Sequence, residues 1–200
     1  MKKAKQKNNE LTEKRRHEIL KAATDVFARN GFRCTDVQEI ADTLGIGKGT
    51  IYRRFGSKEK LFFAVADNAM QMLVERIRVA AQSTSDLRER IRAVIFHYLE
   101  FFEKNRHIIE ILVTERCEFR ERSKPTYITY WQNNIDKTAG AIQKCIQTGI
   151  ARKLDPFYTA EILHNILSGE IFSCCYRKKQ LPLAKRAQAI ADLFFNGILK

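Results

Sequence analysis

The stretch from Thr35 to Lys60, TDVQEIADTLGIGKGTIYRRFGSKEK, predicts two short helices joined by a tight glycine turn and followed by the start of a third helix. The apolar residues of its first half recur at the spacing of one face of a two-turn helix (Val37, Ile40, Ala41 and Leu44). Thr35 is placed to cap this helix, and Gln38, three residues later, would complete a capping box. Gly45 is expected to adopt the left-handed conformation that commonly ends a helix. The pattern therefore predicts a short helix followed by a tight turn.

A second short helix is predicted over Lys48–Phe55, directly after the turn. Ile51 and Phe55 are four residues apart, so both should face inward. The outward face then carries cations and hydroxyl groups (Lys48, Thr50, Tyr52, Arg53 and Arg54). A helix of this kind suits the major groove of DNA. The alternative is an ordinary helical hairpin whose basic face is simply solvated.

The run IADTLGIGKGTIYRRFGSKEKLFFAV, residues 40–65, resembles the helix-turn-helix signature of the TetR family of transcriptional regulators. The sequence departs from the family pattern at two places. Gly47 stands where the family often has Ser, which removes a hydroxyl group. Arg53 and Arg54 stand where it often has Tyr or His. Two arginines still suit contacts to phosphate, but the bases that are read do not carry over from the family.

The resemblance implies a DNA-binding surface. Its expected members are Thr35, Lys48, Gly49, Thr50, Tyr52, Arg53, Arg54 and Lys58. Lys48, Gly49 and Thr50, at the start of the second helix, are expected to meet base edges. Tyr52 and the later cations are expected to contact phosphates, which position a protein without specifying sequence.

Charge is concentrated in the same region. The 200-residue chain carries a net charge of +13. Residues 1–60 hold 15 Lys and Arg against 8 Asp and Glu, whereas the other 140 residues hold 21 against 15. Net positive charge per residue is therefore more than twice as high around the helix-turn-helix. Such a surface attracts nucleic acid by releasing counterions, so binding should weaken steeply with salt.

Several other classes of protein are not indicated. No apolar run approaches the length of a membrane span, and no hydrophobic region follows the basic N-terminus, so a cytoplasmic protein is expected. The five cysteines are scattered without a CxxC pair, so neither a disulfide framework nor a metal site is predicted. The adjacent Cys174 and Cys175 suggest either a thiol sensor or ordinary buried residues. No catalytic motif is present, and we expect neither enzyme activity nor a cofactor.

We predict an all-α fold of nine helices. A three-helix domain over residues 11–57 should follow a basic flexible arm, residues 1–10, which either solubilises the chain or touches DNA. Its first helix should run over Thr12–Asn30 and end at Gly31. Residues 58–200 should form a six-helix domain for effector binding and dimerisation, including one helix between Pro125 and Gly149. The TetR resemblance implies the same architecture.

The last two predicted helices are candidates for a dimer interface. Helix-turn-helix proteins commonly bind two half-sites about one DNA turn apart, which favours a two-fold dimer. These helices are apolar and carry small residues, and the resemblance implies a four-helix bundle made by two subunits. The expected interface residues are Leu163, Leu167, Ile171, Ile190 and Phe194. The alternative is that these residues belong to the internal core.

The C-terminal domain also carries aromatic and polar residues that core packing does not require. They are His97, Tyr98, Tyr127, Tyr130, Trp131, Asn134 and His164. A pocket lined by aromatic side chains with a few polar groups is typical of small-molecule sites. The family resemblance implies a small, largely apolar effector.

The leading hypothesis is therefore a regulator of transcription, most simply a repressor that a small molecule releases from a palindromic operator. The alternative is a DNA-binding protein without an effector, in a chromosomal or scaffolding role. The sequence determines neither the operator, the effector nor the sign of regulation.

Overall fold

The computed structural model describes the backbone of residues 2–174 and 181–198, and the side chains of residues 12–173 and 181–197. Across these residues the chain is built from helices and contains no strand, which confirms the all-α prediction. None of the helices in the described ranges combines the length and apolarity needed to cross a membrane. The side chain of Cys174 and all of Cys175 lie outside the described residues, so their proposed thiol chemistry stays a prediction.

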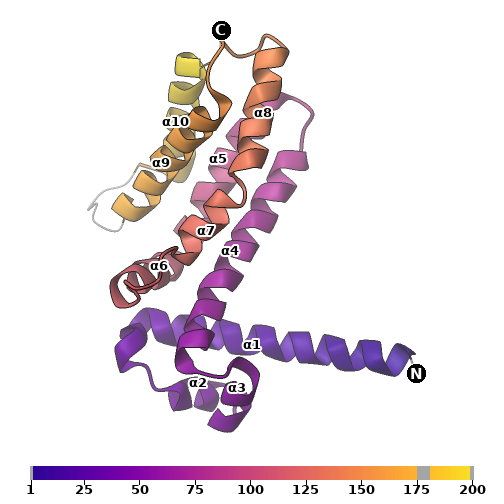
Figure 1. Cartoon of the computed structure of the whole chain (residues 1–200), viewed down its shortest axis with the longest axis vertical. Coiled ribbons are helices and arrows are strands. Elements are labelled where there is room, and N and C mark those ends of the chain that lie inside the picture. Colours follow the sequence, from indigo (N-terminus) through magenta and orange to yellow (C-terminus); the bar gives the residue numbers. More distant parts are fainter. Residues whose placement is uncertain (1, 175–180, 199–200) are drawn as a thin grey trace. The chain divides into compact units, whose positions relative to one another are not determined.

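Ten helices follow one another along the described part of the chain (Figure 1). They are α1 (Lys2–Cys34), α2 (Val37–Thr43), α3 (Lys48–Phe55), α4 (Lys58–Gln82), α5 (Leu87–Lys104), α6 (Arg106–Glu118), α7 (Thr126–Gln132), α8 (Ile135–Gln147), α9 (Pro156–Cys174) and α10 (Leu183–Ile198).

The first helix differs from the prediction at its start. Residues 2–10, expected as a flexible arm, belong to α1. Its end agrees better, because the chain leaves helical geometry at Gly31, where φ is 71°. The predicted boundary after Asn30 is therefore confirmed as a break, although helical structure resumes as far as Cys34.

One helix more than predicted arises between Pro125 and Gly149. The expected single helix is divided into α7 and α8 at Asn133 and Asn134. The Asn134 side-chain amide donates to the Tyr130 carbonyl at 2.7 Å. Asparagine side chains compete in this way with the hydrogen bonds of the helix, which explains why the break falls here.

The chain separates into two compact units. The N-terminal unit comprises the residues up to Met70 together with Glu110–Thr126, and the C-terminal unit comprises Gln71–Ile109 and the residues from Tyr127 onward. Helix α4 thus contributes its first half to one unit and its second half to the other. The functional division predicted at residue 57 stays a prediction.

Aromatic packing joins three helices within the N-terminal unit. Phe62 of α4 lies edge-on to Phe27 of α1, with ring centroids 5.1 Å apart. Phe119, just after α6, lies 4.8 Å from Phe32 and 4.7 Å from Phe63. No local sequence pattern predicts that the end of α6 packs with the helix-turn-helix domain, because the two segments are far apart along the chain.

The C-terminal unit is held together around α5. Helices α9 and α10 both pack against α5, and α8 packs against α9. The core includes Ile95, Leu99 and Phe102 of α5, which are almost completely buried. Arg186 of α10, only 7% exposed, forms ion pairs with Glu103 of α5 and Glu170 of α9. Apolar packing and a buried ionic cluster together fix α9 and α10 on α5.

Candidate functional site

The turn between α2 and α3 has the geometry of a helix-turn-helix. Gly45 adopts φ 60°, and the Ile46 amide donates to the Ala41 carbonyl at 3.1 Å, which satisfies the end of α2. Helix α3 then begins at Lys48, and its Ile51 is buried while Tyr52 and Arg53 are exposed. The sequence prediction of this motif is confirmed, and the buried side of α3 leaves its polar side facing solvent.

The cap of α2 is not the predicted one. Asp36 is the N-cap residue, and its carboxylate accepts from the Gln38 amide at 2.9 Å. Thr35 is 3% exposed and its hydroxyl group donates to the Gly31 carbonyl at 2.6 Å. The predicted capping box is therefore wrong, because the Gln38 side chain donates to Asp42 instead. With its hydroxyl group engaged and its side chain buried, Thr35 supports the fold and presents nothing for DNA to contact.

The start of α3 presents the three residues expected to meet base edges. Gly49 is exposed, with no atom within 4 Å of where a Cβ would stand. Thr50 is half-buried. The Lys48 ammonium donates to the Asp36 carboxylate at 2.6 Å and lies 6.0 Å from the centre of the Tyr52 ring. This hydrogen bond raises the pKa of Lys48, and the pKa of Asp36 is lowered by the Gln38 amide and then by Lys48.

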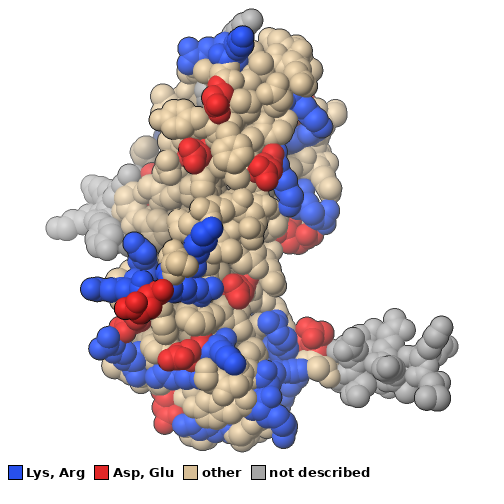
Figure 2. Space-filling model, in the orientation of Figure 1, with Lys and Arg blue, Asp and Glu red and all other residues tan. Residues whose placement is uncertain are grey.

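The two adjacent arginines have different surroundings. Arg54 donates to the Thr12 carbonyl from both terminal nitrogens, at 2.9 and 2.7 Å, and so ties α3 to α1. Arg53 is exposed and forms no hydrogen bond or ion pair with the described residues. Basic side chains are numerous on the drawn face of the N-terminal unit, with acidic ones between them (Figure 2). Of the two arginines, Arg53 is the one whose charge is available to an external anion.

Lys58 was expected to reach a phosphate, but it has partners within the protein. Its ammonium group donates to the carbonyls of Arg33 and Thr35 at 3.0 and 2.7 Å, and lies 4.8 Å from the centre of the Phe32 ring. A lysine in this position satisfies the carbonyl groups at the end of α1. Lys58 therefore joins α4 to the segment between α1 and α2.

Four of the seven predicted effector residues come together in the C-terminal unit. The hydroxyl groups of Tyr98 and Tyr127 are 2.5 Å apart in a buried hydrogen bond. His164 stacks on Trp131 with ring centroids 4.4 Å apart, and lies 5.3 Å from the ring of Tyr127. Phe172 closes one side of Tyr127 at 5.6 Å. We call Tyr98, Tyr127, Trp131, His164 and Phe172 the aromatic cluster.

The aromatic cluster is uncharged near neutral pH. Burial lowers the pKa of His164 to about 4, so its imidazole is neutral. Burial also raises the pKa of both Tyr98 and Tyr127 above the ordinary tyrosine value. The cluster therefore combines apolar ring faces with a few neutral polar atoms.

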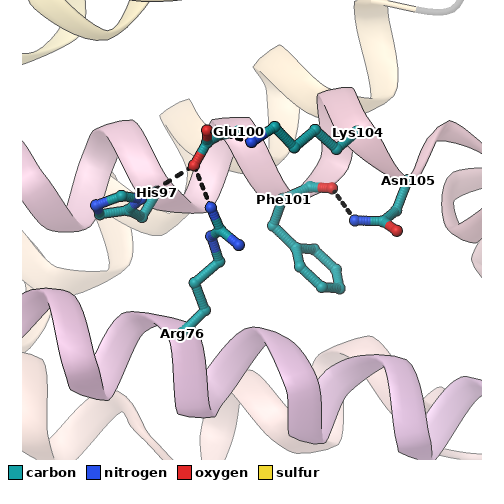
Figure 3. Close-up of polar contacts among 6 residues, drawn as sticks. All are labelled: Arg76, His97, Glu100, Phe101, Lys104 and Asn105. Carbon is teal, nitrogen blue, oxygen red and sulfur yellow. Dashed lines mark hydrogen bonds and ion pairs between the residues drawn. The ribbon is translucent and has the colours of Figure 1, made fainter.

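The other three predicted effector residues, of which Tyr130 is half-buried, lie outside these contacts. His97 points to Glu100, which also binds Arg76 of α4 and, at 2.7 Å, Lys104 (Figure 3). Lys104 contributes most to lowering the pKa of Glu100 to about 2, and Arg76 and His97 add to the effect. Asn134 is occupied in the break between α7 and α8. The prediction for His97 and Asn134 rests on residue type alone, and residue type says nothing of the direction in which a side chain points.

The predicted dimer residues lie in the core of the single chain. Leu163, Leu167, Ile171 and Phe194 are buried, and Ile190 is half-buried. The exposed side of α9 carries Tyr158, Ile162, Asn165 and Gly169 instead, and α10 exposes Leu193. The most regular leucine stripe of α9 faces the core, which favours the alternative that these residues belong to the internal core.

Comparison with known proteins agrees with this geometry. Residues 19–65 match the family model described as "Bacterial regulatory proteins, tetR family". The chain is 36% identical over 91 residues to the HTH-type transcriptional activator FasR of Mycolicibacterium smegmatis, covering 46% of this chain and 42% of FasR. It is also 28% identical over 192 residues to the HTH-type transcriptional regulator YhgD of Bacillus subtilis, covering 91% and 93% of the two chains.

Among solved structures, the ketosteroid transcriptional regulator KstR2 of Mycobacterium tuberculosis shares the fold, with a TM-score of 0.69 at 25% identity. The match covers 93% of this chain and 95% of KstR2. The chain thus spans less than half of FasR but nearly all of YhgD and KstR2. These relatives are named as regulators of transcription and not as enzymes.

Proposed function

Because this chain carries the DNA-binding domain of the TetR family of bacterial regulatory proteins, we propose that it is a cytoplasmic, sequence-specific transcriptional repressor. It binds a palindromic operator as a homodimer and leaves it when a small, largely apolar molecule binds. The observation that carries this proposal is the exposed polar side of α3, which begins directly after a left-handed turn and is anchored by buried Ile51.

The dimensions of α3 suit the major groove. An α-helix with its side chains is about 10–12 Å across, close to the width of about 12 Å of the major groove in B-DNA. Gly49 allows the backbone at the start of α3 to approach the DNA closely. Lys48 and Thr50 flank it with an ammonium group and a hydroxyl group. We therefore assign these three residues to base edges, and Tyr52 and Arg53 to phosphates. Arg54 and Lys58 are assigned mainly to holding α3 and α4 in place.

Binding titrations test the DNA-binding part of the proposal. Fluorescence anisotropy would compare DNA from upstream of the protein's own gene with a scrambled duplex of equal composition, over a series of salt concentrations. The parent should prefer its own DNA, and Thr50→Ala and Lys48→Ala should each reduce that preference by roughly tenfold. Helical content measured by circular dichroism must stay unchanged. Equal binding of both duplexes by the parent would contradict the proposal.

The aromatic cluster supports the effector part of the proposal. Its rings offer apolar contact, while the Tyr98 and Tyr127 hydroxyl groups and the His164 imidazole offer neutral hydrogen bonds. KstR2, which shares the fold, is named as a ketosteroid regulator, and a ketosteroid has this mixture of apolar surface and carbonyl groups.

Release of bound DNA tests the effector. A ketosteroid and a long-chain fatty acid would each be titrated into the protein–DNA complex. We expect one class to release the DNA, and His164→Ala to weaken its effect at least tenfold. His97→Ala is the matched control, because His97 lies on Glu100 outside the cluster. If both histidine variants respond like the parent, the effector site is not at the aromatic cluster. Failure of both probes to release DNA would favour the effector-independent function.

We assign the dimer interface to the exposed side of α9 and to Leu193 of α10. Tyr158 is 64% exposed and Leu193 66%, and large apolar side chains at that exposure favour association. Gly169, on the same side of α9, would permit close approach of a second helix. Sedimentation should show a dimer that Ile162→Lys with Leu193→Lys converts to a monomer. Ile128→Lys on α7, an exposed apolar position outside this surface, should leave the dimer intact.

A further inference from the structure

An acidic residue lies at the start of the proposed DNA-contacting side of α3. Asp36 is 66% exposed, and its ion-pair partner Lys48 is 35% exposed. One carboxylate oxygen, Oδ1, accepts from both the Gln38 amide and the Lys48 ammonium, at 2.9 and 2.6 Å. The other oxygen, Oδ2, has no hydrogen-bond partner among the described residues. The carboxylate is thus fixed in direction while one of its oxygens remains open to solvent.

The capping role alone does not require the charge of Asp36. Capping α2 requires only a side-chain oxygen, and Asn or Ser performs this role about as well as Asp. Exposed ion pairs contribute little to stability. A carboxylate close to DNA phosphates is repelled by them, so its presence here opposes the general attraction of a basic surface. The negative charge is therefore free to serve a contact outside the protein.

The chemistry of the pair matches one kind of base pair. In the major groove a G·C pair presents the acceptors O6 and N7 on guanine beside the N4 amino donor of cytosine. Guanine O6 and cytosine N4 are hydrogen-bonded to each other, about 2.9 Å apart. Lys48 and Asp36 likewise present a donor beside an acceptor, because the Lys48 ammonium lies 2.6 Å from Oδ1 and Oδ2 is the second oxygen of the same carboxylate. Lysine to guanine and aspartate to cytosine are both recognised pairings.

We propose that Asp36 and Lys48 together read one G·C pair in each half-site of the operator. The Lys48 ammonium donates to guanine, and Asp36 Oδ2 accepts from the cytosine amino group. The inference rests on the proposed DNA-binding function and adds a specificity-determining residue from α2 to those at the start of α3. The two bonds to Oδ1 hold the acceptor in position before DNA arrives.

Selection of binding sites from a randomised duplex library tests this inference. The parent is compared with Asp36→Asn, Asp36→Ser and a control variant. Asp36→Asn keeps a capping oxygen but replaces a pure acceptor by an amide, which pairs with adenine. We expect the preference for G·C to fall about tenfold at one position in each half-site, or to change to A·T, with other positions unchanged. Asp36→Ser, which also caps, should lose the same preference without gaining A·T.

Glu59→Gln is the matched control. Glu59 is an exposed acid in the first turn of α4, so this variant removes the same charge away from the pair. It should keep the consensus of the parent. If the Asp36→Asn consensus equals that of the parent and its affinity changes only as much as in the control, Asp36 acts through charge alone and the inference is overturned. A parent that selects no consensus would instead overturn the proposed function itself.

Discussion

The ionic clusters of the C-terminal unit and the exposed side of α3 use charged side chains in opposite ways. In the clusters of the C-terminal unit they are paired with one another: Arg186 lies between Glu103 and Glu170, and Glu100 is bonded to Arg76, His97 and Lys104. In the N-terminal unit, Arg53 has no partner among the described residues, and Lys48 is bonded to a carboxylate that is itself exposed. Charge in the first case is used up inside the protein, whereas in the second it remains available for an external polyanion.

This difference separates two consequences of mutation. Removing Arg186 or Glu100 from the C-terminal unit should lower the free energy of unfolding, because each is itself largely buried and its partners lose their counter-charge. Removing a charge from the exposed side of α3 should change DNA binding and leave stability almost unaltered. If a variant of the C-terminal unit changed only DNA binding, or a variant of α3 changed only stability, the charge of that residue would serve the other role.

The largest effect is expected from Arg186→Ala. It leaves two carboxylates facing each other without the almost fully buried guanidinium, and should lower the free energy of unfolding by about 3 kcal/mol. Urea denaturation followed by circular dichroism measures it. Below the transition the variant should bind DNA like the parent. If the free energy of unfolding falls by less than about 1 kcal/mol, the ionic cluster is not needed to hold α10 on α5.

Glu100→Gln should have the next largest effect, and the effect should depend on pH. The pKa of Glu100 is lowered to about 2, so its stabilising contribution is complete above the ordinary glutamate value and is lost as pH falls toward 2. We expect the parent to exceed the variant by about 2 kcal/mol at pH 7, an amount limited by solvent screening of its partly exposed partners. The gap should narrow steadily below about pH 4.5. A gap that is constant between pH 7 and pH 3 would contradict this account.

His164 should produce a smaller effect with its own pH range. Because its folded pKa is about 4, the unfolded chain takes up the proton first as pH falls below about 6.5. The parent should therefore lose about 1 kcal/mol of stability between pH 7 and pH 5, and His164→Phe should lose less. Denaturation at both pH values measures the difference. His97→Phe serves as the comparison, and the same loss in both variants as in the parent would exclude His164 as the cause.

The smallest effect on stability, and the clearest contrast, is expected from the adjacent arginines. Arg53→Ala should weaken binding to all duplexes alike and reduce the slope of log affinity against log salt by about 1, with stability unchanged. Arg54→Ala should lower the free energy of unfolding by about 1 kcal/mol, because two hydrogen bonds to Thr12 are lost. Anisotropy over a salt series, combined with denaturation, separates the two. Identical behaviour of both variants would refute their assignment to different roles.

The helix-turn-helix could be predicted from sequence because its determinants are local. Ile40, Ile51 and Gly45 act within a few residues of one another, and the structure bears out each of them. The predicted cap of α2, Thr35, is wrong for an equally local reason. Thr35 and Asp36 are both good capping residues, and only the hydrogen bond of Thr35 back to Gly31 decides between them. Asp36 is therefore absent from the predicted DNA-binding surface, although an acidic residue in so basic a region is a signal that could have identified it.

The C-terminal unit was harder to predict because its contacts are distant along the chain. The meeting of Trp131 with His164 depends on how α7 packs near α9, which no periodicity reports. The amphipathic pattern of α9 also identifies an apolar side without saying whether the core or a second subunit covers it. Burial of Leu163 and exposure of Tyr158 settle that point for the single chain.

Methylation interference on a selected operator tests whether the exposed side of α3 reads DNA in the major groove. A methyl group on guanine N7 projects into the major groove, whereas one on adenine N3 projects into the minor groove. If α3 reads the major groove, N7 methylation should block binding at two groups of positions about one helical turn apart, one for each subunit. Interference only in the minor groove, or at a single group of positions, would contradict it.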